Sequence, residues 1–204
     1  KLHYFNLYGR AEHLRLLLHA AGAEYEDVRY EFTEWLGQKG DKTKFPYGQL
    51  PVLEKDGKIF TQSIAIAKFL SKEYGFYPSD DYEAYVQDGA IESLRDIMLE
   101  ISKFSKIKEE DKKEALEELA MSKIAPNFGA WEDSLKANSS QEYWQGDKLT
   151  TADFGFVIFY ADHVKAGPLG EFFTAQLELY PTVKEYFEAR FNGFSDYFEK
   201  RPKC

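Results

Sequence analysis

The sequence contains almost no cysteine. The single cysteine, Cys204, is the last of the 204 residues, so no disulfide can form within the chain. A chain without disulfides fits a reducing compartment, and we therefore expect the cytoplasm. The final residues, RPKC, do not form a prenylation motif, because that motif needs three residues after the cysteine. A thiol at a frayed end is expected to play no catalytic part.

Long apolar runs and an excess of positive charge are missing as well. No apolar run reaches the ~18 residues that a membrane-spanning helix needs. The formal net charge is −9 and the pI is near 5.1. Nucleic acids and anionic membranes favour clustered Lys and Arg, so the sequence predicts neither as a partner. No signal peptide is recognisable, although the sequence starts at Lys1 and not at a methionine.

Familiar catalytic and metal-binding motifs are also absent. No histidine lies three or four residues from another; the four are His3, His13, His19 and His163. One turn of a helix therefore offers no pair of zinc ligands. The chain has no G-x-S-x-G, no Walker loop and no G-x-G-x-x-G. Any chemistry is therefore expected to use the reactive group of a substrate.

The first 75 residues alternate between strand and helix patterns. Strand patterns occupy residues 1–5, 25–30, 52–54 and 58–61, and the last two form a hairpin. Apolar positions at helical spacing occupy 10–21, so the first two strands should pair in parallel across that helix. Ser63 can cap a further helix that ends at Gly75. The segment 33–40, TEWLGQKG, is interpreted as irregular.

Only helical patterns follow the linker FYPSDD. They cover residues 82–107, 109–135, 149–164, 171–180 and 182–194. Pro126 lies inside the second pattern, where it predicts a kink or a break. Thr150 and Asp153 fit a capping box, and the helix after them is apolar nearly all round, so it should be central and buried. The patterns thus predict an α/β domain over residues 1–75 and an all-helical domain over 81–204.

Four blocks spread over essentially the whole chain carry a family resemblance. In order, they are LHYFNLYGRAEHLR, YGQLPVLEKDGKIFTQSIAIAKFL, QDGAIESLRDIM and LTTADF. Together they resemble the sigma-class glutathione S-transferases, a class that includes enzymes of worms, flukes and insects, squid lens crystallins and the vertebrate haematopoietic prostaglandin D synthase. The resemblance implies a thioredoxin-like α/β N-terminal domain followed by an all-α C-terminal domain, which agrees with the division drawn from the patterns.

The resemblance implies that Tyr4 is the catalytic tyrosine and that Arg10 assists it. The thiol of glutathione has a pKa of roughly 8.5 by analogy with free cysteine, so it is mostly protonated at pH 7. A phenol that donates a hydrogen bond to the sulfur anion lowers this pKa, and a nearby arginine favours the anion further. Without the motif, Tyr4 would be interpreted as a core tyrosine. Tyr8 is interpreted as a pocket wall or a surface group.

The resemblance also implies a set of residues that bind glutathione. The main chain of Leu50 pairs with the cysteinyl backbone beside a cis-Pro51, although a trans proline that starts a strand is the alternative. Gln62 and Ser63 hold the γ-glutamyl carboxylate at a helix N-terminus, unless Ser63 only caps the helix. Side chains in the irregular segment hold the glycyl carboxylate. The full set is Tyr4, Arg10, Trp35, Lys39, Gly48, Gln49, Leu50, Pro51, Gln62, Ser63 and Asp96.

Asp96 has a role in the family that requires a dimer. The resemblance implies that this acid reaches across a two-fold interface to the amine of the partner's glutathione, so a homodimer is expected. The vertebrate prostaglandin synthase has paired aspartates here that bind a divalent cation. This chain has Arg95 beside Asp96, with Glu92 nearby, and a fixed cation disfavours such a site. We therefore expect no metal and no cofactor beyond the co-substrate glutathione.

The site for the second substrate is expected to be apolar, between Tyr4 and the long helices of the second domain. The candidate wall residues are Phe5, Tyr8, Met98, Ile101, Ser102 and Phe104. The main hypothesis is a glutathione transferase that acts on small hydrophobic electrophiles, with reduction of organic hydroperoxides as a side activity. The alternatives are a prostaglandin D isomerase, a non-catalytic crystallin-like relative and a carrier of apolar ligands.

Overall fold

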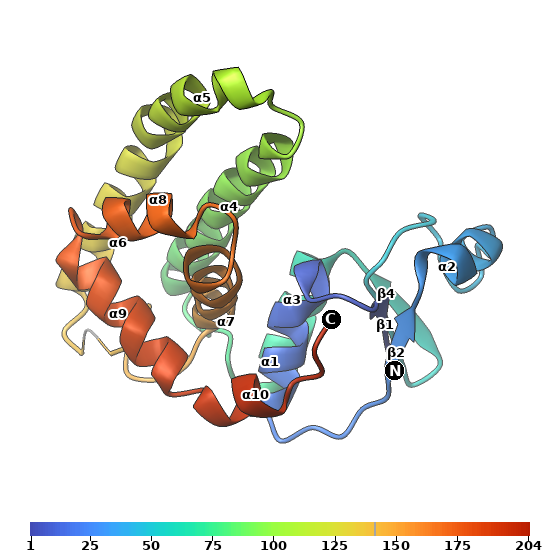
Figure 1. Cartoon of the computed structure of the whole chain (residues 1–204). Coiled ribbons are helices and arrows are strands. Elements are labelled where there is room, and N and C mark those ends of the chain that lie inside the picture. The colour runs from blue at the N-terminus through green and yellow to red at the C-terminus, as the bar shows by residue number, and fades with distance from the viewer. Residues whose placement is uncertain (141) are drawn as a thin grey trace. The chain divides into compact units, whose positions relative to one another are not determined.

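The computed structural model describes residues 1–140 and 142–204, which divide into two compact units. The first unit combines residues 1–77 with residues 195–204, and the second contains residues 78–194 (Figure 1). The first unit is therefore built from both ends of the chain.

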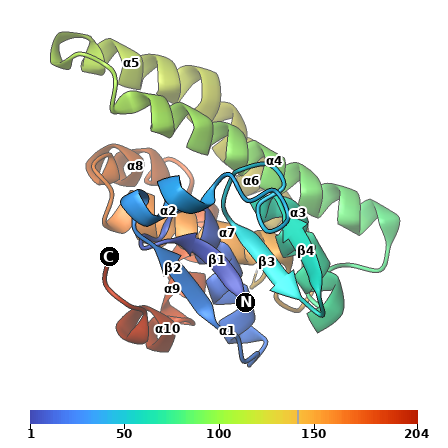
Figure 2. The same cartoon turned by 90° about the vertical axis from the view of Figure 1, so that its right-hand side faces the viewer.

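The first unit has a four-stranded sheet in the order β2-β1-β3-β4 (Figure 2). The strands are β1 (Leu2–Phe5), β2 (Asp27–Tyr30), β3 (Val52–Lys55) and β4 (Lys58–Thr61). The pair β1–β2 is parallel, while β3 is antiparallel to both β1 and β4. The predicted parallel pair and the predicted hairpin are both confirmed, because each follows from a local pattern and a short connection.

Helices cover both faces of this sheet. Figure 1 shows α1 (Glu12–Ala20) and α3 (Ser63–Tyr74) on one face and α2 (Phe32–Gln38) on the other. A 3₁₀ turn, Gly9–Ala11, leads into α1. The chain end adds α10 (Ser195–Lys200) to this unit. The arrangement is the thioredoxin-like fold that the resemblance implies.

The prediction of an irregular segment at 33–40 is wrong, because α2 occupies most of it. A capping box starts this helix: the backbone N–H of Glu31 donates to Glu34 Oε2 at 3.0 Å, and the Glu31 side chain accepts from the backbone in return. Trp35 then anchors the helix, because it is buried against Tyr30 and Phe45. Glycines at 37 and 40 hid the helical pattern.

The start of α3 also differs from the prediction. Ser63 is the first residue of the helix and not its cap. The N-cap is Gln62, which has a φ of 69° and makes no side-chain capping hydrogen bond. The helix ends as predicted at Gly75, which has a φ of 79°. A non-glycine residue with such a positive φ at an uncapped helix start is often associated with a functional site.

The second unit is entirely helical in the part of the chain that the structure describes. Its α-helices are α4 (Asp81–Phe104), α5 (Lys112–Leu119), α6 (Ala125–Ala137), α7 (Thr151–Phe159), α8 (Gly170–Leu177) and α9 (Pro181–Asn192). A 3₁₀ turn lies at Glu109–Asp111, and π-helical turns lie at Ala120–Ile124 and Tyr160–Lys165. No described helix combines the length and the hydropathy needed to cross a membrane.

Pro126 does not break the helical path. It lies in the first turn of α6, directly after the π-helical turn Ala120–Ile124. A proline removes one backbone donor, and the wider turn before it is where the chain departs from regular α geometry. The departure that the proline predicts is therefore a local widening.

The central helix α7 is buried, as its apolar run predicts. Its Phe156 ring lies 4.8 Å from the Trp131 ring and 4.6 Å from the Trp144 ring, between centroids. The capping box is present, with Asp153 Oδ2 accepting from the backbone N–H and the hydroxyl of Thr150 at 2.7 Å each. This start fixes the helix that organises the second unit.

Asp153 is fully buried and joins three segments of the second unit. Besides Thr150, it accepts from the backbone N–H of Trp144 at 2.9 Å and from the hydroxyl of Tyr186 at 2.6 Å. Burial raises the pKa of Asp153, and these donated hydrogen bonds oppose that rise. One carboxylate thus satisfies donors from the loop before α7, from its N-cap and from α9.

Replacement of this carboxylate should destabilise the protein strongly. Asp153→Ala would leave several buried donors unpaired, so we expect the free energy of unfolding to fall by about 3–5 kcal/mol. The matched control is Asp80→Ala, which removes the exposed N-cap of α4 and should cost about 1 kcal/mol. Urea unfolding followed by tryptophan fluorescence measures both, and equal losses would contradict the role given to Asp153.

Candidate functional site

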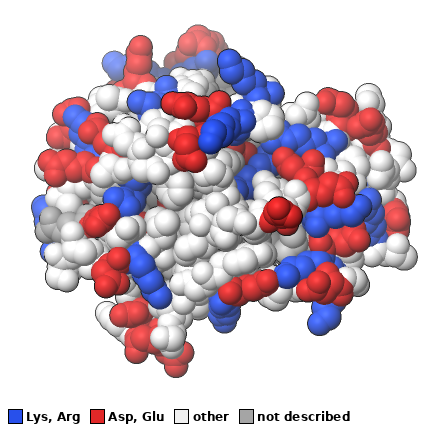
Figure 3. Space-filling view, turned by 90° about the horizontal axis from the view of Figure 1, so that it is seen from below, with Lys and Arg blue, Asp and Glu red and all other residues white. Residues whose placement is uncertain are grey.

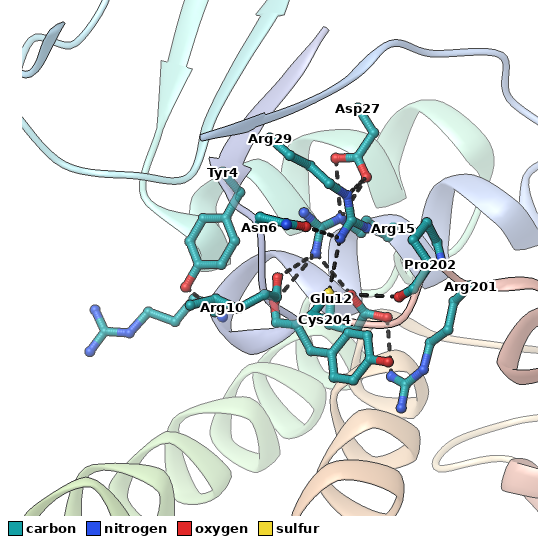
Figure 4. Close-up of polar contacts among 12 residues, drawn as sticks. Tyr4, Asn6, Arg10, Glu12, Arg15, Asp27, Arg29, Arg201, Pro202 and Cys204 are labelled. Atoms are coloured by element: carbon teal, nitrogen blue, oxygen red, sulfur yellow. Dashed lines mark hydrogen bonds and ion pairs between the residues drawn. The ribbon is translucent and has the colours of Figure 1, made fainter. Parts of the chain in front are cut away.

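The hydroxyl of Tyr4 lies in the turn that joins β1 to α1. Tyr4 is 6% exposed, and its Oη accepts the backbone N–H of Arg10 at 2.9 Å (Figure 4). Gly9 has a φ of +45°, and a Cβ there would lie 2.8 Å from Tyr4 Oη. The close approach of the turn to the hydroxyl therefore requires glycine at this position.

The pKa of Tyr4 is raised, so the phenol keeps its proton at neutral pH. Burial raises the pKa, while the Arg10 N–H and the charges of Arg10 and Arg15 oppose the rise. Since Oη already accepts from Arg10, the proton is left to donate, and the described residues supply no acceptor for it. Tyr4 is thus a buried donor whose proton has no acceptor in the described part of the chain.

The turn is tied to the helix behind it by Arg15. Its Nη1 donates to the carbonyl oxygen of Leu7 at 2.9 Å, and its guanidinium carbon lies 5.8 Å from the centre of the Tyr4 ring. In Figure 4 the side chain of Arg10 extends away from this cluster, past the hydroxyl end of Tyr4. Arg10 therefore contributes a backbone N–H that donates to Tyr4 and a positively charged side chain that extends past the Tyr4 hydroxyl.

An open hollow lies beside this turn in the first unit. Its lining residues are Arg10, Tyr47, Gln49, Leu50, Pro51, Thr61, Gln62 and Ser63. Most of them belong to the predicted glutathione set; Tyr47 and Thr61 do not. Thr61 is the last residue of β4, directly before Gln62, so its place in the chain could have indicated it.

The hollow offers main-chain groups that are free to bind a ligand. The Leu50–Pro51 peptide bond is cis, and neither the N–H nor the C=O of Leu50 bonds to any described residue. The uncapped start of α3 at Gln62 and Ser63 borders the same hollow. Unpaired N–H groups and the helix dipole favour an anion there. A peptide with a carboxylate fits such a surface.

Five predicted residues lie outside the lining of the hollow: Tyr4, Trp35, Lys39, Gly48 and Asp96. Trp35 is 6% exposed, and its indole N–H donates to no residue in the described part of the chain. Lys39 is exposed and follows α2. Gly48 has a φ of +59°, and a Cβ there would lie 3.3 Å from the carbonyl oxygen of Lys39 and 3.0 Å from Lys42 Nζ. Gly48 thus lies against the backbone of Lys39 next to the cis-proline loop.

Asp96 lies on α4 in the second unit, with 57% of its side chain exposed. The nearest cation is Lys123 Nζ, 3.8 Å from its carboxylate. The neighbouring Arg95 pairs with Glu92 Oε2 at 2.8 Å. Over residues 1–140 and 142–204, no group of three or more His, Cys, Asp and Glu side chains is placed to hold a metal ion.

The residues suggested as walls of the second site have mixed surroundings. Phe104 is 8% exposed and belongs to the core of the second unit, against which Met98 and Ile101 also pack. Ser102 donates its hydroxyl to the carbonyl oxygen of Leu99 at 2.7 Å. The core position of Phe104 makes it a poor wall residue.

In the first unit, two further wall candidates make aromatic contacts. The Phe5 ring stacks on Phe32 with centroids 4.6 Å apart. Tyr8 lies beneath the guanidinium of Arg201, whose carbon is 3.7 Å from the ring centre. Tyr8 therefore has a packing role that its position in the turn did not suggest.

Comparison with known proteins places these features in a family. Residues 1–72 match the glutathione S-transferase N-terminal domain, and residues 95–201 match the corresponding C-terminal domain. Glutathione S-transferase 1 of Ascaris suum is 31% identical over 100% of this chain and 97% of its own length. Hematopoietic prostaglandin D synthase of Gallus gallus is 34% identical over 76% of this chain and 74% of its own length.

A solved structure agrees with these matches. The monomeric glutathione S-transferase Na-GST-3 of the hookworm Necator americanus superimposes with a TM-score of 0.82 at 31% identity, over 100% of this chain and 97% of that chain. The agreement covers the thioredoxin-like unit and the helical unit alike. The chain belongs to the glutathione S-transferase family.

Proposed function

We propose that this glutathione transferase activates its co-substrate through Tyr4. In this mechanism the hydroxyl of Tyr4 keeps its proton and donates a hydrogen bond to the sulfur of bound glutathione, whose own thiol proton passes to solvent. The stabilised thiolate then forms a carbon–sulfur bond with a hydrophobic electrophile, and in a substitution the leaving group departs with its electron pair. The observation that carries the proposal is the hydrogen bond from Arg10 N–H to Tyr4 Oη, since it leaves the Tyr4 proton without an acceptor in the described chain. Each pKa unit by which the thiol is shifted corresponds to about 1.4 kcal/mol.

The charges and hydrogen bonds of the turn also favour the thiolate form of glutathione. The raised pKa of Tyr4 keeps it a donor at neutral pH, so the tyrosine does not compete with glutathione for deprotonation. The backbone N–H of Arg10 polarises the hydroxyl, which strengthens the hydrogen bond it can donate. The guanidinium of Arg10, at the edge of the hollow, adds a positive charge that favours an anionic sulfur.

The hollow suggests how the tripeptide is oriented. We propose that the free N–H and C=O of Leu50 pair with the cysteinyl backbone and that the start of α3 at Gln62 and Ser63 binds the γ-glutamyl carboxylate. The indole N–H of Trp35 and the ammonium of Lys39 are proposed to bind the glycyl carboxylate. Gln49, Gly48 and Pro51 shape the loop between these contacts.

The sigma class and the homodimer are part of the same proposal. Asp96 is more than half exposed on α4, so its carboxylate is accessible to a partner's glutathione amine. Arg95 already neutralises Glu92, which supports a site without a divalent metal. The single cysteine favours a reducing compartment, and we propose the cytoplasm.

The remaining partners are small molecules in this proposal. Figure 3 shows acidic and basic side chains interspersed over the face that it presents, and the net charge is −9. Interspersed charge on an acidic protein does not favour a nucleic acid or an anionic membrane. A hydrophobic electrophile is the substrate class that remains, with organic hydroperoxides as a further one.

A second candidate function is prostaglandin isomerisation. It is favoured by the similarity to the Gallus gallus synthase and to a structure described as prostaglandin synthase D of Nilaparvata lugens, at 30% identity and a TM-score of 0.79. Both candidate activities use the thiolate of glutathione, so both depend on Tyr4. A crystallin-like or carrier role would instead not need the unpaired donor of Tyr4.

Tyr4→Phe should remove the activity at low pH. Without the hydroxyl, the thiol of bound glutathione should titrate near its free pKa. We therefore expect the conjugation rate to fall about 10- to 100-fold at pH 6.5 and to recover as the pH approaches the pKa of the free thiol. Initial rates of conjugation to a chromogenic aryl halide between about pH 5.5 and 9 measure this.

The matched control is Tyr30→Phe on the neighbouring strand. Tyr30 is also buried, but its hydroxyl is paired within the protein, with His3 Nδ1 at 3.0 Å. It should lower stability and leave the pH profile unchanged. If Tyr4→Phe keeps the wild-type profile, the proposed mechanism is wrong.

Trp35→Phe should weaken glutathione binding without changing the pH profile. Loss of one hydrogen bond to a carboxylate should raise the KM for glutathione about 10-fold, with kcat little affected. Trp131→Phe is the control, because the indole N–H of Trp131 donates within the protein, to Ser93 Oγ at 2.9 Å. An unchanged KM in Trp35→Phe would remove this residue from the proposed binding set.

Asp96→Asn tests the dimer and the shared site together. The neutral side chain should raise the KM for glutathione about 3- to 10-fold, because a hydrogen bond between charged groups is lost. Glu100→Gln, which breaks a surface pair with Lys103 on the same helix, should leave the KM unchanged. Sedimentation of the wild type as a monomer at assay concentrations would contradict the proposed role of Asp96.

A further inference from the structure

A buried carboxylate lies behind the catalytic turn. Glu12, the first residue of α1, is 0% exposed. Its Oε2 accepts from Arg15 Nη1 at 3.0 Å, while its Oε1 accepts from the hydroxyl of Tyr197 at 2.8 Å and from Arg201 Nη1 at 3.1 Å. Figure 4 shows Glu12 between Arg15 and Arg201. A carboxylate without water contact depends on such donors.

Two of these donors come from the far end of the chain. Tyr197 lies on α10 and Arg201 directly follows it, so both are more than 180 positions from Glu12, with sequence separations of 185 and 189. Cys204 continues this segment to β2, where Arg29 Nη1 lies 3.0 Å from its sulfur. The C-terminal segment is thus attached to the first unit at α1 and at the edge of the sheet.

Arg15 connects Glu12 to the turn. The same Nη1 that pairs with Glu12 also donates to the carbonyl oxygen of Leu7 at 2.9 Å, and Nε pairs with Asp27 at 3.1 Å. Arg15 is itself 2% exposed, so its side chain is fixed by packing as well as by these bonds. Leu7 lies three residues before Arg10, whose backbone N–H donates to Tyr4 Oη.

Arg201 reaches the same turn by a second route. Its guanidinium carbon lies 3.7 Å above the centre of the Tyr8 ring, a close cation–π contact. One guanidinium therefore donates to Glu12 and also lies over the Tyr8 ring, a pair of contacts that a lysine ammonium cannot reproduce. Tyr8 lies between Leu7, held by Arg15, and Gly9, which is held against Tyr4.

We propose that Arg201 is a positioning residue for the transferase reaction, which fixes the Leu7–Arg10 turn through Glu12–Arg15 and through the Tyr8 ring. It does not touch the reacting sulfur. It keeps the Arg10 N–H aligned with Tyr4 Oη and thereby directs the free proton of Tyr4. This inference rests on the proposed role of Tyr4. It implies that the C-terminal segment helps to hold the turn beside Tyr4 in position.

The experiment compares the ionisation of bound glutathione in wild type and Arg201→Met. The ultraviolet absorbance of the thiolate is titrated with glutathione bound, and the pH dependence of kcat/KM is measured beside it. If the turn is misplaced, the thiol pKa should rise by about half a unit to one unit, which is roughly a 3- to 10-fold loss of activity below that pKa.

Two further variants keep the test decisive. Tyr197→Phe removes one hydrogen bond to Glu12 and leaves Arg201 in place, so it should raise the pKa of the bound thiol by a smaller amount. This variant replaces Arg201→Met in the test if Arg201→Met does not fold. Arg201→Lys keeps the charge without the planar contact, so it should restore less than half of the loss. Full restoration by lysine would overturn the proposal in favour of charge alone.

Arg190→Met is the matched control in the second unit. Arg190 makes the same pair of contacts, with Glu142 Oε1 at 3.3 Å and with the Tyr143 ring at 4.6 Å, but has no link to the turn. It should leave the thiol titration unchanged. A wild-type titration in the folded Arg201→Met protein would overturn the positioning role. If wild type itself shows no lowered thiol pKa, the proposed function fails instead.

Discussion

The hydrogen bond from the backbone of Arg10 to the hydroxyl of Tyr4 joins the end of a strand to the first turn of a helix. It uses up an acceptor position on the tyrosine and leaves the donor free, which sets the chemical character of the site. Gly9 is required for the approach, and Arg15 holds the turn from behind. Arg10, whose backbone makes this contact, also lines the adjacent hollow.

The sheet makes this arrangement possible by separating two kinds of tyrosine environment. His3 and Tyr4 are neighbours on β1, so their side chains point to opposite faces. His3 bonds to the hydroxyl of Tyr30 and completes a buried polar pair away from the site. Tyr4 has no such partner for its proton. The same residue type is thus structural on β2 and chemically available on β1.

Much of the architecture could be predicted from the sequence because its determinants are local. The hairpin, the capping box at Thr150 and the end of α3 at Gly75 each depend on residues within a few positions of one another. The α2 helix was missed because its capping pair, Glu31 and Glu34, precedes a segment interrupted by glycine. The role proposed for Tyr4 needed the family resemblance, since burial and strand position alone fit a core residue.

The Glu12 cluster could not be predicted from the sequence at all. Its members are ordinary charged and aromatic residues that are joined only by the return of the chain end to the first unit. That return has a consequence for the order in which the protein is made. During synthesis Glu12 emerges long before Tyr197 and Arg201, so its carboxylate lacks both donors until residues 197–201 have left the ribosome. The helical unit, whose residues are contiguous, can fold before that moment. The thioredoxin-like unit is completed after the helical unit, although its sheet precedes that unit in the sequence.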